Sequence, residues 1–197
     1  MSVLRLVLLV AALAASVAVS WADASQQQRR AYTAPETFTS PLQARTATGA
    51  TAATVRIQID RYHSAAELKT MTDAMMYGGY PGFVQALRKA PVVGYVEIGD
   101  VKVALRWARE QPTGKGRAIS LVTERPMYFI GGGKADAKPR EGFELAVVQL
   151  TVDEFGLGSG TMAAAARVKR DPQGSGVLLE DYAEEPIKLT FVHREIK

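Results

Sequence analysis

The sequence predicts an α+β fold that is mainly antiparallel β, either a sandwich or a partly open barrel, with one helical hairpin packed on the sheet. Three observations support this prediction. Apolar and polar residues alternate with a period of two in several short runs, which is typical of half-buried strands. Glycine-containing turns separate these runs. Residues 64–90 instead show the longer apolar period of an amphipathic helix.

The beginning of the chain is expected to precede the folded domain. Residues 1–24 have the pattern of a secretory signal peptide, with an arginine near the start, an apolar run and a small-x-small cleavage site. Residues 25–35 (SQQQRRAYTAP) are polar and lack periodicity, which predicts a flexible leader. We therefore expect an exported protein, periplasmic or extracellular, with a single β-rich domain over residues 36–197.

The strands are predicted in chain order from the period-two runs. The first lies within residues 36–47, where Pro41 requires an edge position or a bulge. Val55, Ile57 and Ile59 alternate with polar residues and predict the second. Further strands are predicted at residues 101–107, 119–121, 127–130, 143–152, 161–169, 177–182 and 187–191.

Two of these strands are expected to carry an unbroken apolar face, because alternate side chains of a strand point to the same side. The face of the first strand consists of Val101, Val103, Leu105 and Trp107. The face of the second strand consists of Met162, Ala164, Ala166 and Val168.

The helical hairpin is predicted over residues 64–90. Ser64 and Glu67 have the spacing of a capping box, which marks a helix start. The apolar face that follows consists of Ala65, Leu68, Met71 and Met75. Gly78-Gly79 predicts the end of this first helix. Pro81 suits the first turn of a second helix, and Pro91 ends it.

Residues 156–181 (GLGSGTMAAAARVKRDPQGSGVLLED) have the outline of a dinucleotide-binding fingerprint, which would imply a nicotinamide or flavin cofactor. The third glycine of the fingerprint is missing, because its position holds Thr161, and Asp171-Pro172 would end the helix too early. The alternating pattern favours a β-hairpin whose loop is residues 171–176, with GLGSG as a flexible connection. We therefore expect no cofactor.

Other apparent motifs also lack the required spacing. Residues 129–136 (FIGGGKAD) lack the first glycine and the Ser or Thr of a phosphate-binding loop, so they predict an ordinary loop. His63 lies beside Asp60 and Ser64, but sequence neighbours at a helix cap point in different directions, which opposes a catalytic triad. His63 and His193 do not have metal-ligand spacing, so no metal site is predicted.

The composition excludes several classes of function. The chain contains no cysteine, which excludes thiol catalysis and thiolate metal sites. The net charge of +4 is spread along the chain, without the basic stripe that nucleic-acid binding requires, so no nucleic-acid partner is expected. No segment after the first 24 residues is apolar for long enough to span a membrane.

Several segments together resemble a group of secreted bacterial proteins without an established activity. These segments are ETFT, RIQIDRY, GGYPGF, ALRKAPVVGYVEIG, GLGSGTMAAAARVK and DYAEEPIKL. The resemblance covers most of the chain after the signal peptide. It implies export and a single domain, and it implies no activity, ligand or catalytic residue.

Residues 71–83 (MTDAMMYGGYPGF) are the most suggestive segment for binding, because methionines and aromatic rings surround a diglycine. Such side chains suit an adaptable apolar pocket, although methionines at helical spacing also suit a core against the sheet. The predicted ligand-binding residues, at a cavity between the helices and the sheet, are Met75, Met76, Tyr77, Tyr80, Phe83 and Tyr95.

Two functions remain open at this stage. The first is an exported non-catalytic module that binds a small apolar ligand or an envelope partner. The second is a hydrolase of the cell envelope or extracellular space that uses a pair of carboxylates as acid and base. The carboxylates considered for this role are Asp60, Glu97, Glu180 and Asp181.

Overall fold

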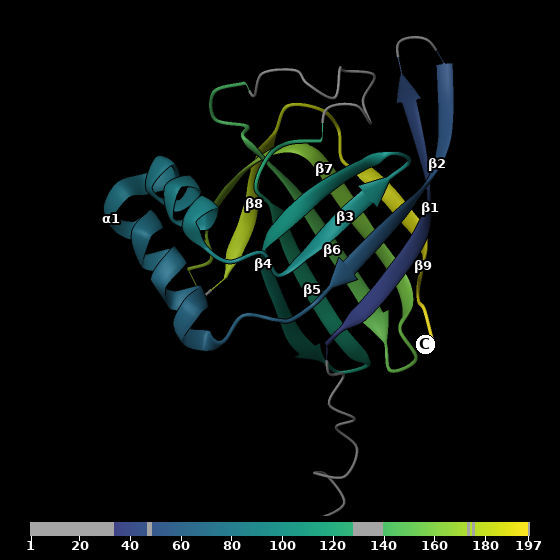
Figure 1. The fold of residues 1–197 in the computed structure, drawn as a ribbon, viewed down its shortest axis with the longest axis horizontal. Coiled ribbons are helices and arrows are strands. Elements are labelled where there is room, and N and C mark those ends of the chain that lie inside the picture. The colour runs from purple at the N-terminus through teal and green to yellow at the C-terminus, as the bar shows by residue number, and fades with distance from the viewer. Residues whose placement is uncertain (1–33, 47–48, 128–139, 173, 175, 197) are drawn as a thin grey trace, which may run out of the picture. The chain divides into compact units, whose positions relative to one another are not determined.

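The computed structural model describes residues 34–46, 49–127, 140–172, 174 and 176–196 (Figure 1). Four predictions lie wholly or mostly outside the described residues. They are the signal peptide at residues 1–24, all but the last two residues of the leader, the strand at residues 127–130 apart from Met127, and the loop at residues 129–136. These remain predictions.

Strands and one helix make up the described domain (Figure 1). The strands are β1 (Glu36–Thr46), β2 (Gly49–Ile59), β3 (Gly94–Ile98), β4 (Val101–Thr113), β5 (Gly116–Thr123), β6 (Leu145–Asp153), β7 (Leu157–Arg170), β8 (Val177–Tyr182) and β9 (Ile187–Arg194). The helix α1 (Ala65–Lys89) lies between β2 and β3 in the chain.

Eight of the strands close into an antiparallel barrel. The order of neighbours is β6-β5-β4-β3-β2-β1-β9-β7, and β7 pairs again with β6 to complete the ring. One edge of β7 is shared, because its first half pairs with β9 and its second half with β8, which stands outside the ring. The mainly antiparallel β prediction is confirmed. The barrel is closed, whereas the sequence suggested a sandwich or a partly open barrel.

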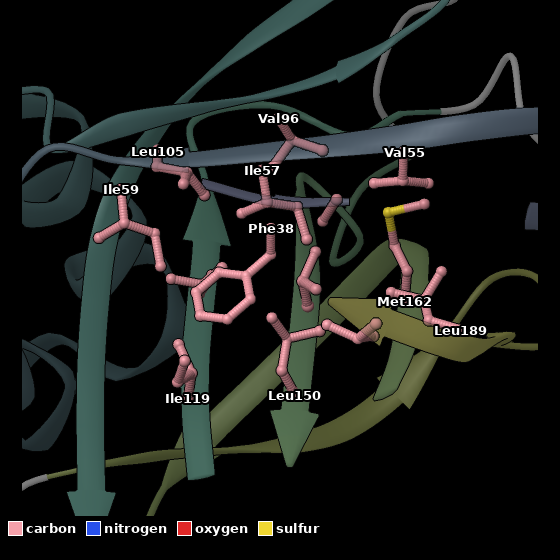
Figure 2. Close-up of a cluster of buried hydrophobic side chains, with 14 of the residues drawn as sticks. Phe38, Val55, Ile57, Ile59, Val96, Leu105, Ile119, Leu150, Met162 and Leu189 are labelled. Atoms are coloured by element: carbon pink, nitrogen blue, oxygen red, sulfur yellow. The ribbon is translucent and has the colours of Figure 1, made fainter. Parts of the chain in front are cut away.

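Apolar side chains fill the barrel, as is usual for an interior formed by eight strands. Val55, Ile57 and Ile59 of β2 point inward, as their alternation predicts, and are at most 1% exposed. They meet Phe38 of β1, which is fully buried. Figure 2 shows this ring beside Ile57, Ile59, Ile119 and Leu150. The interior is therefore a packed core.

A second core lies between α1 and the outer face of the barrel. Met71 and Met75 belong to it, so the methionine face of the helix packs on the sheet. The helix contributes Leu68, Met71, Met75, Tyr80, Phe83, Val84 and Leu87. The barrel and β8 contribute Trp107, Val122, Leu145, Val147, Ala163, Ala166, Val168 and Val177. This packing fixes α1 against a rigid support.

Bulges in β4 and β7 overturn the two predicted unbroken faces. The β4–β5 register shifts between Leu105 and Trp107, so Leu105 points into the barrel and Trp107 points out toward α1. The register of β6 and β7 shifts in the same way, so Ala164 points in and Ala166 points out. An extra residue in one strand moves all later side chains to the opposite face. The bulges thus supply apolar residues to both cores.

The helix begins as predicted and has a kink where the sequence suggested a turn. The Ser64 side chain accepts a hydrogen bond from the Glu67 N–H, and the Glu67 carboxylate accepts one from the Ser64 N–H, which completes the capping box. Gly79 has non-helical angles (φ 61°, ψ −160°), but the helix continues to Lys89. α1 therefore consists of two helical segments that meet in a kink at Gly79, and the hairpin arrangement suggested by the sequence is not confirmed.

The glycines of GLGSG have a different role from the predicted one. Gly158 and Gly160 lie within β7, and a Cβ atom at Gly158 would come within 1.9 Å of the Thr151 carbonyl oxygen of β6. They permit close strand contact, so the prediction of a flexible connection is wrong. The predicted hairpin is confirmed, because β7 and β8 are antiparallel and the Asp171 N–H donates to the Gly176 carbonyl at 2.9 Å.

Candidate functional site

Three of the six predicted ligand-binding residues lie together in the core between α1 and the barrel. Met75, Tyr80 and Phe83 are all buried there. Phe83 meets Trp107 edge to face, with 5.9 Å between the ring centroids. These side chains fill the contact between helix and barrel.

The other three predicted residues do not join this cluster. Met76 and Tyr77 face solvent, with 50% and 85% of their surface exposed. Tyr95 lies on β3, where the Lys102 ammonium nitrogen is 4.2 Å from the centroid of its ring. The structure therefore divides the predicted set between a packed core and two separate stretches of surface.

An open groove of about 390 Å³ lies beside the second part of α1. We call it the α1 groove. Its lining consists of Tyr80, Pro81, Val84, Gln85, Arg88, Lys89 and Glu144. Tyr80 is the one residue that it shares with the predicted set. Its volume falls within the range of ~300–1,000 Å³ typical of small-molecule sites.

The helical period creates one wall of the α1 groove. Pro81, Val84, Gln85 and Arg88 stand at positions i, i+3, i+4 and i+7, so they share one face of α1. The opposite wall comes from Glu144, just before β6 begins. Helix and barrel thus each supply one side.

Tyr80 joins the two walls. Its hydroxyl accepts a hydrogen bond from the Glu144 N–H at 3.2 Å and donates one to the Ala166 carbonyl at 3.2 Å. Burial raises the pKa of Tyr80 above its ordinary range, so the hydroxyl stays protonated as a donor. The guanidinium carbon of Arg167 lies 5.1 Å from the centroid of the Tyr80 ring. This end of the groove is held in place from several directions.

The α1 groove carries positive charge at its other end. Arg88 and Lys89 lie in the last turn of α1, where cations also interact favourably with the helix dipole. Neither residue forms an ion pair with any part of the chain that the structure describes. Arg88 Nε makes one long contact, at 3.5 Å, with the Glu124 carbonyl oxygen. The two charges are therefore available to an anion.

Glu144 supplies a carboxylate to the α1 groove. Its Oε1 accepts a hydrogen bond from the Gly142 N–H at 3.0 Å. Its Oε2 is shielded from water. The Glu144 carboxylate lies near the Tyr80 hydroxyl and, together with burial, raises the pKa of Tyr80.

A second hollow, of about 300 Å³, lies on the outside of the barrel near the place where β1 stops pairing with β9. Its lining consists of Pro41, Gln43, Lys188, Thr190 and Phe191. Phe191 is 73% exposed, and Lys188 is the single cation of the lining. This hollow therefore offers one cation to an anion, whereas the α1 groove offers two.

A buried ionic cluster closes the barrel at the end where β1 begins. Arg117 donates to both carboxylate oxygens of Glu36, at 2.6 and 2.8 Å, and to Glu110 at 2.9 Å. The Tyr62 hydroxyl also donates to Glu36. Burial alone would lower the pKa of Arg117, but the hydrogen bonds to Glu36 and Glu110 and nearby negative charge raise it above the ordinary value. Each of these side chains bonds to another member of the cluster, as in a structural ion-pair network.

The two histidines are far apart in the fold. His63 is buried, and its Nδ1 accepts a hydrogen bond from the Ala108 N–H at 3.2 Å. Burial lowers the pKa of His63 and favours the neutral ring. His193 lies on β9, with its Nε2 2.7 Å from the Thr39 hydroxyl oxygen. Within the described ranges, no three His, Asp or Glu side chains are grouped so as to hold a metal ion.

The four carboxylates considered for hydrolysis have separate partners. Glu97 pairs with Lys102 at 2.6 Å, and Glu180 pairs with Arg167 at 2.8 Å. Asp60 accepts a hydrogen bond from the side chain of Gln58, and Asp181 accepts one from the N–H of the next residue. Their immediate contacts are those of ordinary surface ion pairs and turns.

No family model, no curated protein and no solved structure matches this chain. Within the ranges that the structure covers, no helix has both the length and the hydropathy needed to cross a bilayer. The α1 groove is therefore the feature from which we infer a function.

Proposed function

We propose that this protein is an exported, non-catalytic binding module whose ligand docks in the α1 groove. One observation supports this proposal above the others. The groove combines an apolar floor, Pro81 and Val84, with two cations, Arg88 and Lys89, that pair with no described carboxylate. The packed interior favours this external groove as the place of binding, because side chains occupy the space in which many barrels hold a ligand.

The lining indicates an amphipathic anion as the ligand. A carboxylate or similar group would accept charge-assisted hydrogen bonds from Arg88 and Lys89. An apolar body would cover Val84, Pro81 and the ring edge of Tyr80. The sequence alone suggested an apolar ligand, and the two cations extend that hypothesis to a ligand with one charged end.

The pattern of residues 1–24 supports a location outside the cytoplasm. Cleavage after the small-x-small motif would leave a mature chain beginning at Ser25. Mass spectrometry of the protein from its own host is expected to show this amino terminus. An intact Met1 in the mature protein would contradict export by this signal.

The binding proposal is tested with two matched probes, N-acetyl-Leu-Ala-Leu with a free carboxylate and the same peptide with a carboxamide terminus. We expect the carboxylate probe to stabilise the protein by about 2.7 kcal/mol at a hundredfold excess over its Kd. Arg88→Ala and Lys89→Ala should each weaken binding about tenfold, which corresponds to ~1.4 kcal/mol. Urea denaturation with and without the probe measures the gain in stability, and isothermal titration calorimetry measures the change in affinity.

Lys115→Ala is the matched control, because it removes one exposed cation from the turn between β4 and β5. It should bind the carboxylate probe as the wild type does. The proposal is wrong if neither probe binds. It is also wrong if the carboxamide binds as tightly as the carboxylate, or if Arg88→Ala and Lys89→Ala change affinity no more than Lys115→Ala.

A further inference from the structure

Strand β9 turns two consecutive side chains toward solvent. Leu189 and Val192 both belong to the core inside the barrel. Thr190 and Phe191, which lie between them in the chain, are both exposed. A regular strand alternates its side chains between the two faces of a sheet, so two inward residues three positions apart require an extra residue. β9 therefore has a bulge at Thr190 and Phe191.

The registers of both neighbouring strands confirm this bulge. Gly158 and Gly160 of β7 are two residues apart, whereas their partners on β9 are three residues apart. Pairing with β1 stops at Thr39 and resumes at Leu42, three residues later, whereas the partners on β9 are four residues apart. Bulges re-aim side chains and are frequent beside functional sites. The second hollow lies at this bulge, because both exposed residues belong to its lining.

The lining of the second hollow combines an aromatic ring with neutral polar groups. The bulge holds the Phe191 side chain outward, where 73% of its surface is exposed. The face of such a ring carries partial negative charge and attracts the weakly positive C–H groups of a second molecule. The Gln43 amide and the Thr190 hydroxyl can each both donate and accept hydrogen bonds. A sugar ring presents the C–H groups and hydroxyls that match this lining.

The charge of the second hollow selects among sugars. Lys188 is exposed, and it forms no ion pair with any residue in the described part of the chain. The described lining contains no Asp or Glu side chain. A carboxylate on the ligand would therefore meet a positive charge without an opposing negative one, and it would accept a charge-assisted hydrogen bond.

We propose that the second hollow binds an acidic saccharide, in which the sugar rings carry carboxylates. One ring stacks its C–H face on Phe191, its hydroxyls bond to Gln43 and Thr190, and its carboxylate accepts from Lys188. The volume of about 300 Å³ is at the lower end of the range of ~300–1,000 Å³ for small-molecule sites, which suits a short saccharide. The α1 groove and the second hollow share no residue, so this inference does not rest on the proposed function.

Calorimetry with three probes tests this inference on the wild-type protein. The probes are trigalacturonic acid, the same trisaccharide with its carboxylates methyl-esterified, and propane-1,2,3-tricarboxylate, which has carboxylates but no sugar ring. We expect the acidic trisaccharide to bind about tenfold more tightly than either of the other probes. The ester lacks the charge that Lys188 recognises, and the tricarboxylate lacks the C–H face that stacks on Phe191.

Variants of the second hollow locate the site. Phe191→Ala and Lys188→Gln should each weaken binding of trigalacturonic acid about tenfold. Tyr77→Ala removes an aromatic ring that is 85% exposed on α1, and Lys115→Gln removes an exposed cation from the turn between β4 and β5. Both should bind the acid as the wild type does. Arg88→Ala removes a cation of the α1 groove and should also leave this affinity unchanged.

The inference is overturned if trigalacturonic acid does not bind, or if the ester or the tricarboxylate binds as tightly. It is also overturned if Phe191→Ala binds like Tyr77→Ala, or if Arg88→Ala weakens binding, because the acid then occupies the α1 groove. None of these results touches the proposed function, which is tested with peptide probes. If Phe191→Ala does not fold, Lys188→Gln and the comparison of probes on the wild type decide.

Discussion

Replacing Gly158 by alanine tests the closure of the barrel between β6 and β7. A Cβ atom at this position would lie 1.9 Å from the Thr151 carbonyl oxygen, and 2.9 Å from both the Thr151 carbonyl carbon and Val152 Cα. Ordinary contact begins at 3.4 Å, so the oxygen is 1.5 Å too close. All three atoms belong to the backbone of β6 and cannot swing aside as a flexible side chain would.

The strands must therefore separate locally, which strains the hydrogen bonds of the closing ladder. We expect Gly158→Ala to destabilise the protein by ~1–3 kcal/mol or more, the usual cost of overpacking. Urea denaturation followed by far-UV circular dichroism measures the change, and the slope of the transition should stay constant.

Gly114→Ala is the control for this experiment. Gly114 lies in the turn between β4 and β5, and no atom lies within 4 Å of a Cβ built there. It should change the unfolding free energy by only a few tenths of a kcal/mol, as for ordinary surface substitutions. If Gly158→Ala costs no more than Gly114→Ala, β6 and β7 do not approach closely and the closed ring is refuted.

Two further predictions concern the core between helix and barrel and a buried histidine. Met71 is 4% exposed in the second core, so Met71→Ala should lower the free energy of unfolding by ~2–5 kcal/mol, as measured by urea denaturation. A decrease below a few tenths of a kcal/mol would show that this helix face is exposed. Burial lowers the pKa of His63 in the folded protein, whereas a histidine in the unfolded chain titrates near 6.5. The unfolded chain therefore takes up a proton first as the pH falls. The free energy of unfolding should be constant above about pH 6.5 and should decrease below it. His63→Asn still offers an amide oxygen to the Ala108 N–H, and it should lose no stability between pH 7.5 and 5.5 through this group. If its stability depends on pH as that of the wild type does, His63 is not the group responsible.

The local features of the fold could be predicted from the sequence. The alternation at Val55, Ile57 and Ile59 identified β2 and its inward face. The spacing of Ser64 and Glu67 identified the helix start, because a capping box involves only neighbouring residues. In each case the information lies within one turn or one strand.

Features that depend on distant pairing could not be predicted. The alternation at Leu105 and Trp107 is unbroken in the sequence, and the bulge that separates them is visible only from the register against β5. Gly158 is required by its approach to β6, which the local sequence does not show. The contact between Tyr80 and Glu144 at the α1 groove joins segments far apart in the chain, so no local pattern indicated it.

The most direct test of the account is nuclear magnetic resonance mapping of N-acetyl-Leu-Ala-Leu on the isotope-labelled protein. We predict that the largest amide shifts occur at Val84, Gln85, Arg88 and Glu144, which surround the α1 groove, and that they saturate with the calorimetric affinity. Shifts centred on Lys188 and neighbouring residues of the second hollow, or no shifts at saturating peptide, would contradict the assignment of the α1 groove as the binding site.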